Sequence, residues 1–138
     1  MATLEQARID IVTAIEAAKT GAPVSPLIIE YDNRIVVDTQ TQTKPYLAVH
    51  IKFLDGRQAD LATKPIHRMS GQIHLAAVVK DGTGSSEALK LLDFFYPQLQ
   101  QRSMGTVRCH MAKLAQPSPH LGWNYYPVLI PFWFDKIY

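Results

Sequence analysis

The stretch RMSGQIHLAAVVK at residues 68–80 decides the fold, because it predicts the central strand of the sheet. Apolar and polar residues alternate along it, and side chains two positions apart lie on the same face of a strand. Gln72 and His74 are expected on the polar face. The predicted inward face consists of Ile73, Leu75, Ala77 and Val79.

A glycine-rich turn, DGTGSS at residues 81–86, follows this strand and leads into a helix. Ser85 or Ser86 can cap the free amides at the helix start, and Glu87 suits the positive end of the helix dipole. Because Pro97 disfavours a helical conformation of the preceding residue, we expect the helix to end or kink at Tyr96. Its predicted apolar face consists of Ala88, Leu91, Leu92 and Phe95.

The chain also predicts an N-terminal helix and several other strands. Thr3 and Gln6 have the spacing of a capping box, and an apolar face continues from Leu4 to Ala18. Asp55 and Gly56 indicate a turn. Extended segments are expected at residues 27–31, 35–37, 46–53, 107–111 and 123–133.

The last of these strands contains Pro127 and Pro131, which each lack a backbone donor, so we expect it at a sheet edge or bulged. The element order predicts an α+β fold: a mixed, mostly antiparallel sheet of four to five strands with two helices packed on one face. No repeat or linker divides the chain, so residues 1–138 are expected to form one domain.

Composition limits the possible functions. Only 19% of the 138 residues are charged, which favours surfaces that are buried against partners, and the net charge of +2 gives no concentrated basic patch for nucleic acid. The single cysteine, Cys109, permits no internal disulfide and fits a reducing compartment. Acidic residues near the N-terminus are unlike a signal peptide, and no apolar run is long enough for a bilayer. We therefore expect a cytosolic-type protein without a membrane partner.

Two groups of residues suggest ligands, but each has a structural explanation. The turn at residues 82–86 precedes a helix N-terminus, as phosphate-binding loops do, yet it lacks the P-loop lysine and the dinucleotide-binding spacing. His50, His74 and His110 share the polar phase of three strands, but no nearby Asp or Glu in that phase completes a metal site. We expect no metal and no cofactor.

The sequence offers little material for catalysis. Cys109 alternates with Val107 and Met111, which indicates a small core residue, and the carboxylates form no acid–base pair. We expect no catalytic residues and no enzyme activity. The aromatic C-terminal strand could stack on bases, but arginines do not alternate with its rings, so core packing and a subunit interface are favoured.

Several short motifs together resemble a known family. They are EYDN at 30–33, the strand at 46–53, RMSG at 68–71, DGTG at 81–84 before a helix, and a final aromatic strand ending in Phe134 and Asp135. Over residues 1–135 the pattern is similar to the tail terminator (minor tail) proteins of phages with long, non-contractile tails, and to the phage-related family grouped with them. The most telling element is Arg68-x-x-Gly71, a strand, Gly82-x-Gly84 and a helix.

The resemblance implies a non-enzymatic virion subunit that forms a ring, typically hexameric, at the head-proximal end of the tail tube. Its implied partners are itself, the tail tube protein and a head-completion or connector protein, in the virion tail and, during assembly, in the bacterial cytoplasm. We expect contacts from residues 39–44, 54–66 and 116–122. The candidate interface residues are Arg57, Arg68, Asp81, Trp123 and Tyr125.

Three alternatives remain open. The chain could be another phage neck protein, such as a tail completion or connector protein. It could instead be a small cytosolic ligand-binding or enzymatic domain that uses the turn at residues 82–86. The third is a single-strand nucleic-acid binder, although we expect no specific nucleic-acid partner.

Overall fold

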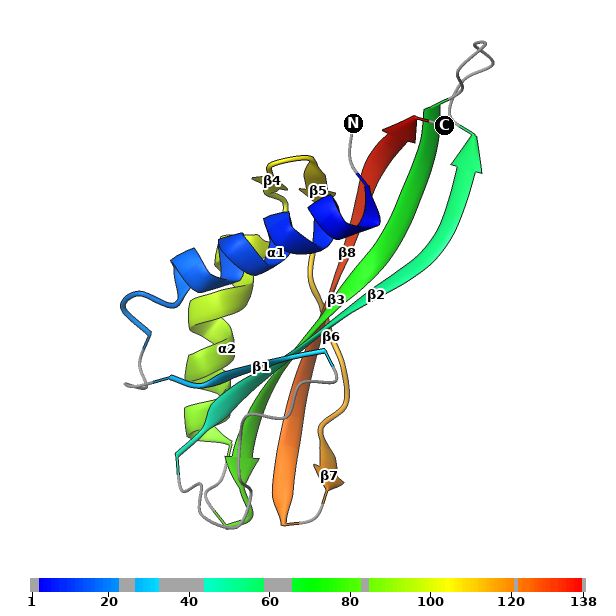
Figure 1. The fold of residues 1–138 in the computed structure, drawn as a ribbon. Helices are drawn as coiled ribbons and strands as arrows, with labels where there is room; N and C mark the ends of the chain where they lie inside the picture. The colour runs from blue at the N-terminus through cyan, green and yellow to red at the C-terminus, as the bar shows by residue number, and fades with distance from the viewer. Residues whose placement is uncertain are drawn as a thin grey trace.

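The protein is a twisted sheet with two helices on one of its faces (Figure 1). This computed structural model describes residues 3–22, 27–32, 44–58, 66–82, 85–120 and 122–137. In chain order the elements are α1 (Leu4–Ala18), β1 (Ile29–Tyr31), β2 (Tyr46–Gln58), β3 (Ile66–Lys80), α2 (Ser86–Leu99), β4 (Ser103–Met104), β5 (Val107–Cys109), β6 (Lys113–Leu114), β7 (Ser118–His120) and β8 (Trp123–Ile137).

The sheet has the order β1-β2-β3-β8-β5-β4, and β6 and β7 also pair with β8. Among the described strands, only β1 pairs in parallel, with β2, so the predicted α+β class and mostly antiparallel sheet are confirmed. The predicted number of four to five strands is wrong, since the described part of the chain already contains eight in one sheet. Five of them are only two or three residues long. Of these, β1 and β5 lie within predicted segments, whereas β4, β6 and β7 are too short for apolar alternation to reveal them.

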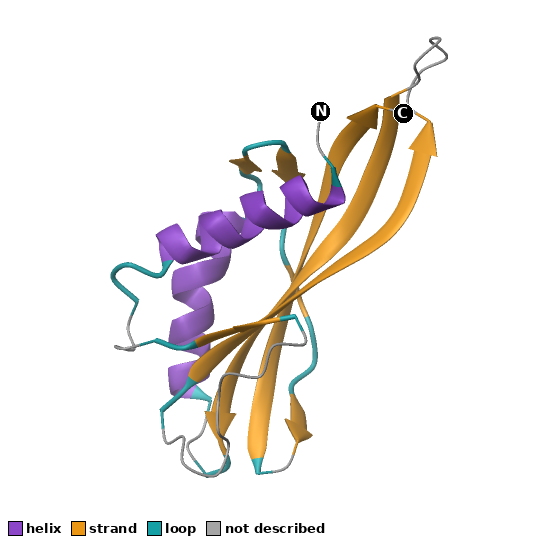
Figure 2. Ribbon diagram, in the orientation of Figure 1, coloured by secondary structure: helices purple, strands orange, loops and turns teal. Residues whose placement is uncertain are grey.

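Three long strands form the framework. The central strand β3 pairs with β2 from Tyr46 opposite Val78, and with β8 along its whole length. One end of this trio continues past the helices, as Figure 2 shows. We call this end the arm and define it as residues 54–58 of β2, 66–70 of β3 and 133–137 of β8.

The core lies between the helices and the predicted inward face of the sheet. All four inward residues of β3 are at most 1% exposed, so the predicted face is confirmed. Both helices bury their apolar stripes in the same cluster, which confirms that they pack on one face. The helix residues in this cluster are Ala7, Ile11, Ile15, Ala18, Ala88, Leu91, Leu92, Phe95 and Leu99.

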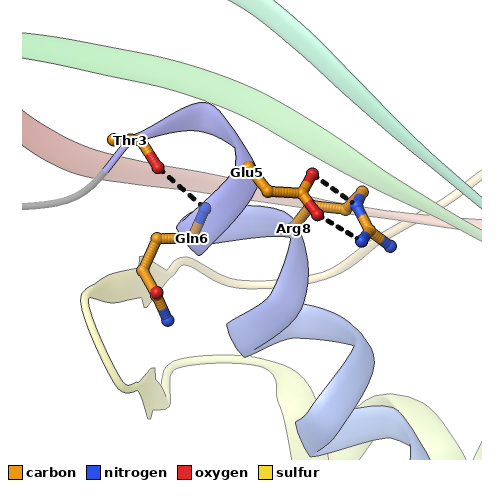
Figure 3. A network of polar contacts seen from close by, with 4 residues as sticks. All are labelled: Thr3, Glu5, Gln6 and Arg8. Carbon is orange, nitrogen blue, oxygen red and sulfur yellow. Dashed lines mark hydrogen bonds and ion pairs between the residues drawn. The ribbon is translucent and has the colours of Figure 1, made fainter.

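The N-terminal helix begins and ends as predicted. The Thr3 hydroxyl accepts a hydrogen bond from the backbone N–H of Gln6 at 3.1 Å, and Glu5 pairs with Arg8 on the next turn (Figure 3). The reciprocal contact of the capping box is not made, because the Gln6 side chain donates to Asp10 instead, at 2.9 Å. One half of the capping-box prediction is therefore confirmed.

The second helix differs from prediction at both ends. It continues through Pro97 to Leu99, so an end at Tyr96 is wrong. The bond that proline removes would have reached the carbonyl of Asp93, an exposed residue, where water can replace the lost donor. At the other end Ser85 is the N-cap residue, but its side chain makes no capping hydrogen bond.

The predicted turn at Asp55 and Gly56 is wrong, because β2 continues through both residues to Gln58. The register with β3 shifts between Phe53 and Gly56, and a bulge of this kind absorbs extra residues while the strand continues. Glycine and aspartate therefore mark an irregularity inside a strand here, and not its end.

The last strand is not an edge strand, contrary to prediction, since β3 lies on one side and β5, β6 and β7 on the other. His110 and Ala115 donate backbone hydrogen bonds to the carbonyls of Pro131 and Pro127, at 2.8 and 3.2 Å. The N–H and C=O of one strand residue point toward the same neighbouring strand. The positions where Pro127 and Pro131 lack an N–H therefore also point toward the short strands, into the gaps between them. The pairing with β3 therefore needs no bulge, and none is present.

The region before β8 also differs in detail. The predicted strand at 107–111 ends at Cys109, and Met111 is 58% exposed where the chain leaves the sheet. The expected loop at 116–122 contains β7. The segment predicted at residues 35–37 lies outside the described residues.

Candidate functional site

The described candidate interface residues fall into two groups at opposite ends of the sheet. Arg68 lies in the arm, whereas Trp123, Tyr125 and Asp81 lie where β8 begins and β3 ends. Along β3 the two groups are roughly 40 Å apart, at about 3.3 Å per residue. Arg57 is opposite Arg68 in the β2–β3 register, but its side chain is outside the described part of the structure.

In the arm, Arg68 is held by two residues of β8. Its guanidinium donates to both carboxylate oxygens of Asp135, at 2.9 and 3.1 Å, and lies 4.0 Å from the centre of the Trp133 ring. A two-point ion pair and a cation–π contact hold a guanidinium in one orientation. Trp133 and Asp135 are not among the predicted interface residues, although their spacing of two in one strand places both on one face.

At the other end, a small second core lies on the sheet face opposite the helices. It contains Tyr46, Val78 and Trp123, and the rings of Tyr46 and Trp123 meet edge to face at 5.5 Å. Burial, together with a hydrogen bond to Tyr125, raises the pKa of the Tyr46 hydroxyl. Trp123 is only 3% exposed, so its side chain is already packed within the chain.

Asp81 is exposed beside this second core. It accepts a hydrogen bond from the side-chain amide of Asn124 at 2.7 Å, which links the end of β3 to the start of β8. In the adjoining turn, Gly82 has φ +86°, and residues 83 and 84 lie outside the described residues. The phosphate-binding interpretation of this turn therefore stays a prediction.

The histidines are only partly brought together. His50 and His74 lie directly opposite each other on β2 and β3, with ring centres 6.0 Å apart, whereas His110 lies beyond β8. The expectation that no carboxylate is near is wrong, because Asp32 contacts His50 at 2.7 Å. Asp32 directly follows β1, which pairs with β2, and this pairing could not be seen in the sequence.

The Cys109 thiol is part of the core, and the described residues form neither a three-ligand metal cluster nor a membrane-spanning helix. Cys109 is buried beside Met104, and burial raises the pKa of its thiol to about 12, so the predicted core role is confirmed. Among the described residues, no cluster of three metal-ligating side chains occurs. No described helix is both long enough and apolar enough to cross a membrane.

An open cavity of about 590 Å³ lies beside α1 and the end of α2, and Asp10 is part of its wall. Asp10 accepts hydrogen bonds from the backbone N–H and hydroxyl of Thr106, at 3.0 and 2.7 Å, and from Gln6. Burial opposes ionisation, but these bonds outweigh it and lower the pKa of Asp10. The carboxylate is thus occupied in tying α1 to the β4–β5 turn.

We predict that Asp10→Ala destabilises the protein by about 1–2 kcal/mol at neutral pH, because the Thr106 donors lose their acceptor. Since the folded-state pKa lies below the ordinary 3.8, the stabilisation is present above that value and is lost as pH falls through the folded-state pKa. Urea unfolding at pH 7 and near pH 3 measures this difference. Asp93→Ala, on the exposed face of α2, is the control, and equal losses for both variants would contradict the prediction.

Comparison with known proteins gives the fold alone. No family model and no curated protein matches the chain. One solved structure, of a protein whose name describes no activity, is similar with a TM-score of 0.68 and 14% identity, and the match covers 100% of this chain and 99% of the other. An α+β fold of this size and layout therefore occurs in a second protein of very different sequence.

Proposed function

We propose that this chain is a structural subunit of a phage tail, which forms a ring at the head-proximal end of the tail tube and takes part in joining the tail to the head. The motif pattern that resembles tail terminator proteins supports this proposal. The observation that carries it on the structural side is the arm, in which two different strand edges have no partner strand among the described residues.

The two edges belong to β2 and β8. β1 pairs with β2 only at residues 47–49, and β5 pairs with β8 only at residues 132 and 133. In the described part of the chain, residues 52–58 and 134–137 therefore have no strand partner on their outer sides. Such edges offer unpaired backbone groups to another chain.

Two different edges on one subunit suit a particular kind of assembly. Contacts between unlike surfaces are heterologous, and they produce a ring when the rotation between subunits closes. The separation of Arg68 from the exposed Asp81, at opposite ends of β3, fits the same arrangement, although Trp123 is buried within its own chain. A ring subunit needs no activated nucleophile, so this function uses surfaces and not a catalytic centre.

Light scattering on a size-exclusion column tests the ring. We expect one closed oligomer, a hexamer in the family that the chain resembles, whose mass stays constant over a wide range of protein concentration. Arg68→Glu should shift it toward the monomer, because the new carboxylate repels Asp135 and alters the arm surface. A monomer at every concentration would remove the physical support for self-assembly.

Two control variants separate the internal and intermolecular roles of Arg68. Lys90→Glu changes an exposed charge on α2 and should leave the oligomer unchanged. The double variant Arg68→Asp with Asp135→Arg restores an ion pair but moves its charges. If this double variant regains the oligomer, the pair acts within the subunit. If it stays monomeric with a normal unfolding temperature, the arm contacts a neighbour.

A further inference from the structure

Two imidazole rings meet on the sheet face opposite the helices. His50 on β2 and His74 on β3 are directly opposite in the antiparallel register, and their planes cross at 70° with centres 6.0 Å apart. The next pair on the same face consists of Lys52 and Gln72. Because both histidines lie on long, paired strands, their backbones have fixed relative positions.

Asp32 orients the first ring. Its Oδ1 atom lies 2.7 Å from Nδ1 of His50 and also accepts the backbone N–H of Ile51 at 2.8 Å. A carboxylate that receives the Nδ1 hydrogen of a histidine leaves Nε2 as the free lone pair. In metal sites, a ligating histidine usually donates its other ring N–H to a carboxylate in this way. The carboxylate fixes the ring orientation and makes the free nitrogen a stronger ligand.

The second ring carries an unsatisfied atom. Nε2 of His74 is buried and has no hydrogen-bond partner among the described residues. Buried polar atoms nearly always have a partner, so an orphan of this kind indicates a missing ligand or water. Burial first, and then electrostatic repulsion from the neighbouring His50 and Lys52, lower the pKa of His74, which favours the neutral ring. A neutral imidazole is the form that coordinates metals.

We propose that His50 and His74 bind one divalent transition-metal ion of the zinc class, each through a ring nitrogen, with Asp32 as the positioning residue. Two imidazoles on one tetrahedral zinc ion, at Zn–N distances of about 2.0–2.1 Å, have ring centres roughly 5–5.5 Å apart. The observed separation is 6.0 Å, so binding requires the two rings to approach each other slightly. Water completes the coordination, and the nearby Lys52 ammonium weakens binding by repulsion.

The test is a titration of the full-length, tag-free protein with Zn²⁺ alone, by calorimetry and by proton–nitrogen NMR spectra of the histidine rings. We expect binding of one ion per chain, with the ring signals of His50 and His74 shifting together. His50→Ala and His74→Ala should each abolish saturable binding. Asp32→Asn should weaken it about 10–100-fold, as changes in second-sphere carboxylates do.

Two further variants serve as controls. His110→Ala removes a histidine that lies beyond β8 and should leave the affinity unchanged. Lys52→Gln removes the neighbouring positive charge and should tighten binding. Circular dichroism of each metal-free variant verifies its folding. Absence of binding, binding that survives both His50→Ala and His74→Ala, or loss of binding in His110→Ala would overturn the proposal.

Discussion

Gly71→Ala is expected to destabilise the protein by about 3 kcal/mol or more, a loss at the upper end of those caused by overpacking a core. Gly71 is a buried residue of the central strand and lies opposite Phe53 on one side and Phe132 on the other. A Cβ atom there would meet the Lys52 carbonyl oxygen and the Phe132 ring, both within 2.5 Å. The carbonyl belongs to the paired strand β2, so relief requires the two strands to separate.

Urea unfolding followed by tryptophan fluorescence measures this loss, and Gly82→Ala is the matched control. Gly82 has φ +86°, but nothing lies within 4 Å of its absent Cβ atom, so alanine there costs about 1–2 kcal/mol of backbone strain only. A loss for Gly71→Ala no larger than that of the control would contradict the close approach of β2, β3 and Phe132.

The long elements could be predicted from the sequence, because each buries one face over many residues. The alternation from Ile73 to Val79 spans several repeats, and the apolar stripe of α1 spans about four turns, so the sequence predicts both elements with the correct inward side. The short strands β6 and β7 could not be predicted, because β6 is two residues long with both exposed and β7 lies in a segment rich in proline. Backbone pairing with β8 holds β6 and β7 in place, and such pairing leaves no pattern of side chains in the sequence.

Predictions from single residues or short motifs are wrong where the structure depends on which strands are neighbours. Pro127 and Pro131 indicate an edge strand only if their missing donors face water, and here they face gaps in a broken row of partner strands. The same limit applies to the candidate sites. His50 and His74 could be placed on the polar face, but their contact and the approach of Asp32 depend on strand register and order. The sequence therefore identifies faces, and the sheet order decides which residues meet.

Phe95→Ala is expected to cost about 3–5 kcal/mol, as truncation of a buried phenylalanine does when the surroundings cannot close the cavity. Phe95 is fully buried on α2, a helix that contacts α1, β3 and β8, so its ring joins the helix layer to the sheet. Phe94 packs against it edge to face at 5.1 Å and cannot fill the space, because its own position on the helix is fixed. Equilibrium unfolding in urea measures the loss.

Substitutions of different size at position 95 should destabilise the protein by different amounts, and an exposed residue of the same helix serves as the control. Phe95→Leu retains most of the apolar volume, so it should lose less than half as much as Phe95→Ala. Leu89, on the same helix, is 49% exposed, and Leu89→Ala should change the stability by no more than about 0.5 kcal/mol. If Phe95→Ala and Leu89→Ala lower the stability equally, α2 does not pack on the sheet through the face that contains Phe95. We expect stability to rise in the order alanine, leucine, phenylalanine at position 95. This order indicates that the volume of the cavity determines the loss of stability, because α2 is held between α1 and two long strands that cannot move inward.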